Sequence, residues 1–208
     1  LANYSKFRIP HYWYSTKADR VNLTLQNSFD LRNVSSATLR FYTKYDIEYG
    51  WDFGYIELSI NNGTSWVHLN TTGTSTYIDP FYASSPSYAP NYYNLGQPAL
   101  TGSVSDWTLE TSDITPFAGR NVLIRFRYVT DDSYSEHGWL VDDISIPEIG
   151  FFDDVESGVK NWSTDAWLHN VIFMNDSSNI TPIYLDFIIP NNYSSNSSDQ
   201  KVIVMELS

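Results

Sequence analysis

Residues 45–66 read YDIEYGWDFGYIELSINNGTSW and hold the clearest strand-and-turn signal of the chain. Apolar and polar residues alternate from Ile56 to Ile60, which is the period of a half-buried β-strand. Asn62-Gly63 follows, a dipeptide that favours a tight two-residue hairpin turn. The run from Trp66 to Leu69 then supplies the returning strand. This stretch therefore predicts a β-hairpin with one face in a core.

The same alternation recurs along the chain and predicts further strands. It appears at Val21–Leu25, at Leu39–Lys44, at Val122–Tyr128 and at Leu140–Ile146. No convincing amphipathic helix interrupts these runs. Many short strands separated by turn signals are typical of a sandwich or jelly roll. We therefore expect an all-β fold, an antiparallel β-sandwich of jelly-roll type with a long irregular loop.

Charge and composition restrict the classes of function. The 208 residues include 24 acidic and 12 basic ones, for a formal net charge of −12, and no cysteine. A phosphate backbone would be repelled, so we expect no nucleic-acid partner, whereas cations are natural ligands. Without cysteine there is neither a disulfide framework nor a zinc–thiolate site. No apolar run approaches the length of a membrane-spanning helix, so we expect no membrane span.

Asn-x-Ser/Thr sequons are dense in this chain, and several fall at predicted turns. Chance produces some of them in a sequence so rich in Asn, Ser and Thr. Ten of them still favour an extracellular or cell-surface glycoprotein. The ten asparagines are Asn3, Asn22, Asn33, Asn62, Asn70, Asn161, Asn175, Asn179, Asn192 and Asn196.

Residues 71–105 form a long stretch rich in Ser, Pro, Gly, Asn and Tyr. Loops of this length are uncommon in compact domains and are often functional. Its aromatic side chains have two interpretations. They pack as a flap over the sandwich, which we favour, or they stack on sugar rings, which would make the chain a carbohydrate-binding module. The candidates for glycan stacking are Tyr82, Tyr88, Tyr92 and Tyr93.

Three segments together carry a family pattern: LTLQNSFDL, LRFYTKYDIEYGWDFGYIELSINNGTSW and DWTLETSDITPFAGRNVLIRFRYVTDDSYSEHGWLVDDISI. Across residues 20–146 the chain resembles the non-catalytic β-sandwich module of immune inhibitor A-type secreted metallopeptidases, and more loosely the MAM-type jelly rolls. The resemblance implies a jelly roll over residues 1–148. It also implies a structural or adhesive role toward other extracellular proteins or copies of itself.

Residues 149–208 differ in character from the rest. The text FFDDVESGVKNWSTDAW, residues 151–167, resembles the opening strand of such a module but stands after its closing strand. Strand-like runs follow at 183–189 and 201–207. This part of the chain completes its own sandwich, completes a neighbour's, or starts a second module. Completion of a neighbour's sandwich would be donor-strand complementation and would link copies into an extracellular filament or surface assembly.

The motifs of several enzyme classes are absent from the sequence, and although acidic residues are plentiful enough for a glycosidase pair, nothing in the sequence positions them. The four histidines, His11, His68, His137 and His169, contain no pair spaced i, i+4, so the zinc-peptidase motif is missing. There is also no cysteine nucleophile, no G-x-S-x-G elbow and no Gly-rich phosphate loop. We therefore expect no enzymatic activity.

A structural calcium ion is the expected cofactor. Alternation in the strand 140–146 places Asp142 on the same face as Leu140, Ile144 and Ile146, and a carboxylate facing a core needs a cation or strong donors. The competing interpretation is that Asp142 accepts backbone N–H bonds or pairs with an arginine. The resemblance implies that the opening-strand acid, the closing aspartates and acidic loops at one end provide oxygen ligands. The candidate ligands are Asp46, Glu48, Asp52, Asp131, Asp142, Asp143 and Glu156.

Overall fold

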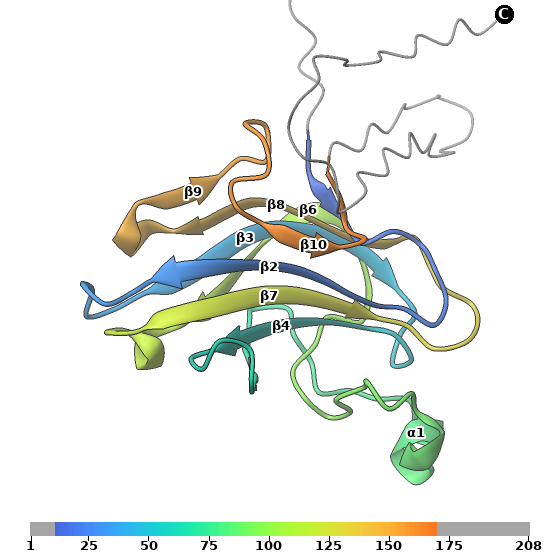
Figure 1. The fold of residues 1–208 in the computed structure, drawn as a ribbon. Helices are drawn as coiled ribbons and strands as arrows, with labels where there is room; N and C mark the ends of the chain where they lie inside the picture. The colour runs from blue at the N-terminus through green and yellow to red at the C-terminus, as the bar shows by residue number, and fades with distance from the viewer. Residues whose placement is uncertain (1–10, 170–208) are drawn as a thin grey trace, which may run out of the picture.

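Two antiparallel sheets pack face to face in the computed structural model, which describes residues 11–169 (Figure 1). The first sheet has the order β11 (Leu168–His169), β1 (Trp13–Tyr14), β8 (Gly138–Ile146), β3 (Thr38–Ile47), β6 (Gly102–Asp113), with β9 (Phe151–Asp153) also paired to β8. The second has the order β10 (Ser163–Asp165), β2 (Asn22–Asp30), β7 (Asn121–Val129), β4 (Phe53–Ser59), β5 (Val67–His68). The helical elements are α1 (Pro80–Ser84) and the short 3-10 helices η1 (Pro86–Tyr88), η2 (Thr115–Phe117) and η3 (Pro147–Ile149). The predicted all-β sandwich is confirmed.

The core lies between the two sheets and is built from the apolar side of each alternating strand. Phe41 of β3 meets Phe126 of β7 edge to face, with ring centroids 5.0 Å apart. Trp139 of β8 is fully buried beside them, and its ring leaves no room for a Cβ at Gly54 of β4. The glycine in the WDFGY segment therefore allows β4 to approach this tryptophan closely.

A turn at Asn62-Gly63 lies between β4 and β5, as predicted, but the last strand pair before it is Leu58↔Val67, so the connection is longer than the expected two-residue hairpin. Asn62 and Gly63 have φ angles of 55° and 83°, the left-handed conformations of a type I′ turn. Ser59 helps to close the turn, because its hydroxyl accepts a hydrogen bond from the Gly63 N–H at 2.9 Å. The strand ends at Ser59, so Ile60 lies outside it and is 46% exposed instead of facing the core.

A β-bulge in β8 overturns the predicted alternation of this strand. Its pairing with β3 shifts register between Tyr42↔Asp142 and Arg40↔Ser145, and Asp143 has a positive φ of 47°. The extra residue returns Ile144 to the core face occupied by Val141. Asp142 therefore does not share a face with Ile144 and Ile146, contrary to the prediction. Asp142 instead lies near Tyr12. Burial is the main cause of the raised pKa of Tyr12, and the charge of Asp142 adds to it.

Residues 151–169 pair with both sheets of the same chain. β9 pairs with β8, β10 with β2, and β11 with β1. Trp162 and Trp167 are buried in the main core, and the Trp162 indole N–H donates to Asp153 Oδ2 at 2.8 Å. The division of the chain at residue 148 stays a prediction, because the strand-like runs at 183–189 and 201–207 lie outside the described residues.

The flap, residues 71–105, packs on the outer face of β4, as expected. A second apolar cluster forms there, and its buried members are Phe53, Tyr55, Ala99 and Val129. The flap residues that pack against it are Ile78, Tyr92, Tyr93 and Leu95. Every residue of β4 is consequently buried, on both faces of the strand. The sheet face that would otherwise meet solvent is covered over this region.

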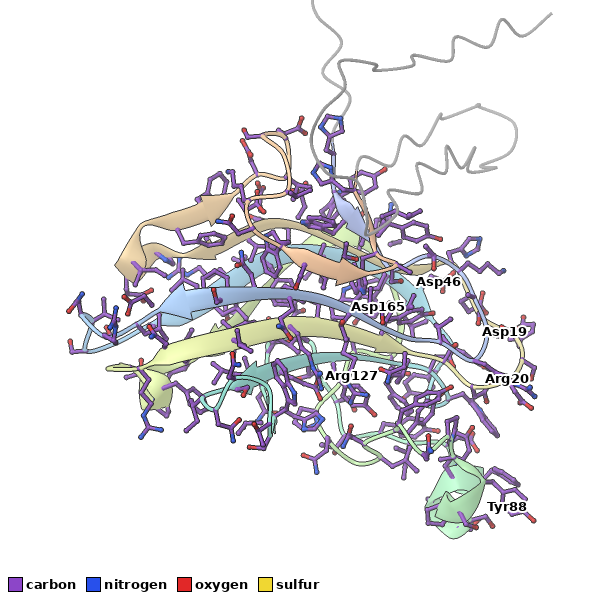
Figure 2. The ribbon with its side chains drawn as sticks, in the orientation of Figure 1. Asp19, Arg20, Asp46, Tyr88, Arg127 and Asp165 are labelled. Atoms are coloured by element: carbon purple, nitrogen blue, oxygen red, sulfur yellow. The ribbon has the colours of Figure 1, made fainter. Side chains whose placement is uncertain are left out.

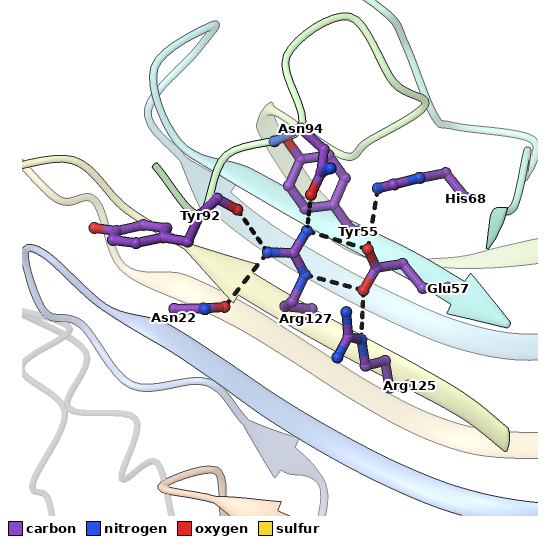
Figure 3. Close-up of polar contacts among 8 residues, drawn as sticks. All are labelled: Asn22, Tyr55, Glu57, His68, Tyr92, Asn94, Arg125 and Arg127. Atoms are coloured by element: carbon purple, nitrogen blue, oxygen red, sulfur yellow. Dashed lines mark hydrogen bonds and ion pairs between the residues drawn. The ribbon is translucent and has the colours of Figure 1, made fainter. Parts of the chain in front are cut away.

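A buried ion-pair network holds the flap against the sheet (Figure 3). Glu57 of β4 is 1% exposed, and its carboxylate lies 2.5 Å from Arg125 Nε and 2.9 Å from Arg127 Nε, both in β7. Arg127 also donates to the Tyr92 carbonyl at 2.8 Å and to the Asn94 side chain, both in the flap. Arg125 stacks on the Trp66 ring at 3.8 Å. Because one arginine bonds both β4 and the flap, sheet and flap are fixed relative to each other.

Within residues 11–169, no helix has the length and apolarity that crossing a bilayer requires.

Candidate metal centre

Three acidic side chains converge at one end of the sandwich, where β3 passes into β4 and where β7 ends. Glu48, Asp52 and Asp131 each place a carboxylate oxygen within 4.8 Å of the others. We call these three residues the carboxylate triad. The β3–β4 turn brings Glu48 and Asp52 together, because the Asp52 N–H donates to the Glu48 carbonyl at 3.0 Å. Gly50 permits this turn with a φ of 80°, and a Cβ there would collide with Asp79 of the flap.

Two oxygen atoms of the triad are buried and lack a hydrogen-bond partner among the described residues. They are Glu48 Oε2 and Asp52 Oδ2. Asp52 is fully buried, and its other oxygen accepts the Asp131 N–H at 2.9 Å. Buried carboxylate oxygens without a donor are costly unless a proton or a cation satisfies them. The carboxylate oxygens of the triad therefore lie close together, and two of them still have the capacity to accept a hydrogen bond or to bind a cation.

The electrostatics of the triad show the same imbalance. Burial raises the pKa of Asp52 from 3.8 to about 8, and the charges of Asp131 and Glu48 add to the rise. Burial also raises the pKa of Glu48 from 4.5 to about 7, with further contributions from Asp131 and Glu136. Like charges this close disfavour ionisation, so a proton or a cation would relieve the repulsion among the three carboxylates.

Two hydroxyl groups of the flap bond to the triad. Tyr82 donates to Asp131 Oδ2 at 3.1 Å, and Tyr93 donates to Asp52 Oδ1 at 3.4 Å. The Ser133 N–H occupies Asp131 Oδ1 at 3.0 Å. The flap is therefore connected to the acidic end of the sandwich as well as to the Glu57 network.

The other predicted metal ligands fall into two different places. Asp46 lies in a neighbouring group with Glu136 and His137, and His137 Nδ1 is 2.7 Å from Asp46 Oδ2. Figure 2 shows Asp46, Asp19 and Arg20 at this same end of the sandwich. Asp142 and Asp143 lie in the β8 bulge and do not join the triad.

Glu156 belongs to the neighbourhood of the bulge. Burial raises the pKa of Asp142 to about 7, and the charges of Asp143 and Glu156 add to it, so these three residues are close enough to interact. Glu156 already accepts the His11 N–H at 2.8 Å. Asp142, Asp143 and Glu156 do not meet as a three-ligand group among residues 11–169. Their role as ligands stays a prediction, as does that of Asp46.

The four tyrosines predicted to stack on sugars differ in exposure. Tyr82 is 3% exposed, whereas Tyr88 is 73% exposed. Tyr93 packs edge to face on Phe53, and the Tyr92 hydroxyl donates to the Thr130 carbonyl at 2.8 Å. Tyr88 alone of the four presents most of its ring to solvent, and glycan stacking by these residues stays a prediction.

Sequence reasoning missed two parts of this end of the molecule. Trp51 lines a surface cavity together with Glu48 and Asp131. Arg20 lines the same cavity and pairs with Asp132 at 2.9 Å. The aromatic and acidic composition of the loop around Trp51 was the available signal. No local pattern pointed to Arg20, because its contacts come from a segment 112 positions away.

Five of the ten sequon asparagines lie within the described residues, and all five are exposed. They are Asn22, Asn33, Asn62, Asn70 and Asn161. The other five, Asn3, Asn175, Asn179, Asn192 and Asn196, lie outside the described residues. Glycosylation stays a prediction at all ten positions.

Fold and site together define the class of this protein: a jelly-roll β-sandwich module with an acidic loop end. The family model "Immune inhibitor A-like, MAM domain" matches residues 9–170, so the chain belongs to that family. The match extends the predicted resemblance, residues 20–146, at both ends. It includes the displaced opening-strand text at 151–167, which the structure places in the same sandwich.

Three curated relatives illustrate where such a module occurs. Immune inhibitor A of Bacillus thuringiensis subsp. alesti is 30% identical over 154 residues, 70% of this chain and 19% of the relative. The pre-pro-metalloprotease PrtV of Vibrio cholerae serotype O1 (strain M66-2) is 26% identical over 134 residues, which are 64% of this chain and 13% of the relative. Bacillopeptidase F of Bacillus subtilis (strain 168) is 22% identical over 113 residues, which are 54% of this chain and 6% of the relative. The matched part is therefore a small share of each relative.

Proposed function

We propose that this chain is a non-catalytic extracellular module with a structural or adhesive role, stabilised by calcium bound at the carboxylate triad. The observation that carries the proposal is the geometry of Asp52, fully buried with one oxygen unpartnered and aimed among two further carboxylates. Calcium suits such a site, because it takes six to eight oxygen ligands in flexible geometry. Glu48, Asp52 and Asp131 would hold the ion, and the ion would supply positive charge at a crowded acidic end.

Both the comparisons and the sequence support the non-catalytic and extracellular parts of the proposal. The chain corresponds to at most 19% of the curated relatives described above, and its sequence lacks the paired histidines of a zinc peptidase. Sequon density favours export, and all described sequon asparagines are exposed. Extracellular calcium modules bind the ion with dissociation constants of about 10⁻⁴–10⁻³ M. The partners would be other extracellular proteins or copies of this chain.

Calorimetry and thermal unfolding of the full chain test the proposal. After removal of divalent ions with a chelator, we expect calcium to bind and to raise the melting temperature. At a calcium concentration of 100 times the dissociation constant, the gain in unfolding free energy is about 2.7 kcal/mol. Asp52→Asn should abolish this response while retaining the stability of the metal-free wild type, because the amide removes one of three crowded charges.

Asp165→Asn is the matched control. Asp165 is an exposed residue of β10 that lies outside the triad (Figure 2), so its variant should respond to calcium like the wild type. A wild-type chain that neither binds calcium nor gains stability from it would contradict the proposal. An Asp52→Asn variant that keeps the full calcium response would contradict the assignment of the ion to the triad.

A further inference from the structure

A surface cavity opens beside the carboxylate triad. Its volume is about 650 Å³, within the range of pockets that accept small ligands. Glu48 and Asp131 of the triad line it on one side, and flap residues including Phe81 and Tyr88 line it on the other. Figure 2 shows Arg20 and Tyr88 at the end of the molecule where this cavity lies.

One wall of the cavity is aromatic. Trp51 and Phe81 stack with ring centroids 5.7 Å apart and an interplanar angle of 22°, and Phe81 meets Tyr88 at 5.6 Å. Phe81 is 45% exposed and Tyr88 is 73% exposed, so their rings contact solvent as well as each other. In residues 11–169, most other flap aromatics are instead packed on β4 or on the triad. Such exposed rings provide flat surfaces for an apolar face of a ligand.

The remaining walls carry donors and acceptors of hydrogen bonds. Arg20 offers guanidinium N–H groups, and Asp132 beside it offers carboxylate oxygens; their side chains are 72% and 65% exposed. Asn91 adds an amide, which both donates and accepts. A pyranose ring has an apolar C–H face and an edge of hydroxyls that both donate and accept. This combination of a stacked aromatic wall and mixed polar groups matches that chemistry.

The flap wall depends on the triad for its position. Tyr82 is adjacent to Phe81 and donates to Asp131 Oδ2. Asp79 caps the N-terminus of α1, and its Oδ1 accepts the Phe81 N–H at 2.8 Å. Repulsion among the three carboxylates would loosen these contacts in the absence of a cation. A cation at the triad would hold Asp131 in place, and with it the flap side of the cavity. Occupation of the triad and ligand binding would then be linked.

From this geometry we propose that the cavity is a saccharide-binding site whose aromatic wall is Trp51, Phe81 and Tyr88, and that calcium at the triad strengthens binding. The proposal rests on the calcium-dependent function proposed above and assigns that module a ligand class. Arg20, Asn91 and Asp132 would bond the hydroxyl edge of the sugar. Tyr88 contributes as one of the four predicted stacking residues, while Trp51 and Phe81 are additional to them.

A printed array of neutral and acidic oligosaccharides tests the proposal. It is probed with the fluorescently labelled full chain, once with calcium and once with a chelator. We expect binding in calcium and a clear loss in chelator. Tyr88→Ala and Phe81→Ala should each weaken binding to the best oligosaccharide by about tenfold, the effect of losing one aromatic contact. Phe152→Ala is the control, because Phe152 is 55% exposed but lies in β9, outside the cavity.

Calcium calorimetry on the same samples separates this proposal from the previous one. Calcium binding without oligosaccharide binding would overturn the saccharide site and leave the calcium module standing. Oligosaccharide binding that the chelator does not change would overturn the link to calcium. A lysine-rich peptide spotted on the same array probes the alternative occupant. If the peptide binds, and Tyr88→Ala abolishes that binding while no sugar binds, the cavity recognises basic side chains instead.

Discussion

The hydroxyl of Tyr82 donates a hydrogen bond to Asp131 Oδ2 at 3.1 Å, although the two residues are 49 positions apart. The bond joins the flap to the end of β7 at the carboxylate triad. Tyr82 is buried, and its ring packs against that of Trp51 with ring centroids 4.8 Å apart. The position of the flap and the geometry of the triad therefore depend on each other.

Replacing Tyr82 by phenylalanine removes this hydrogen bond and keeps the ring. We expect Tyr82→Phe to lower the unfolding free energy by about 1–3 kcal/mol, because a buried charged acceptor loses its donor. Urea denaturation measures the loss. Tyr88→Phe is the control, since Tyr88 is mostly exposed, and it should stay within about 0.5 kcal/mol of the wild type. Equal effects of the two substitutions would contradict the structural role of the bond.

The Glu57 network predicts a loss of stability in acid. Burial alone raises the pKa of Glu57, but hydrogen bonds from His68, Arg127 and Arg125 and the charge of Arg127 together lower it from 4.5 to about 2. A carboxyl with a lowered folded-state pKa stabilises the fold above its unfolded value, and this stabilisation disappears as the pH falls from about 4.5 to about 2. The difference between the unfolded and folded pKa corresponds to a loss of stability on the order of 3 kcal/mol.

Denaturation of the wild type and of Glu57→Gln across this pH range checks the prediction. The glutamine variant lacks the titrating group, so the difference between the two proteins should shrink as the pH falls. Near neutral pH the variant should be less stable by about 3–5 kcal/mol, because it leaves two arginines without their buried partner. A stability difference that does not change with pH would show that Glu57 does not carry the effect.

The bulge at Asp143 predicts an order among substitutions at this position. Asparagine tolerates a positive φ and glycine adopts it freely, whereas a β-branched residue is strained there. Asp143→Asn should match or exceed the wild type in stability, since it also removes a charge near Glu156 and Asp154. Asp143→Val should cost about 1–2 kcal/mol. Thermal unfolding that ranks valine equal to asparagine would argue against the bulge.

The pairing of residues 151–169 within the same chain predicts a mass that does not depend on dilution. Light scattering over a dilution series, with and without a calcium chelator, measures it. A monomer throughout would agree with self-completion of the sandwich, whereas oligomers that survive dilution would favour strand exchange between neighbours.

Trp162→Ala tests the same segment by its effect on stability. Removing this buried indole should lower the unfolding free energy by about 3–5 kcal/mol.

Local sequence signals predicted the elements of this fold well. Alternation identified β2, β3 and β7, and the left-handed preference of Asn62-Gly63 identified the turn after β4, because both are properties of neighbouring residues. Alternation failed at Asp142, where one inserted residue changes the face of every later side chain. It also missed the burial of Arg127, which follows from the flap packing over β7.

The class of fold, the strand segments and the abundance of acidic oxygen ligands depend on composition and on spacing along the chain, so they could be predicted from the amino-acid sequence. Which of the acids meet depends on tertiary packing. Pairing of Phe53 with Val129 sets β4 against β7 in a register that brings Asp52 next to Asp131. Asp52 and Asp131 are 79 positions apart, and the register that joins them depends on the packing of the whole sandwich, so no local pattern contains it.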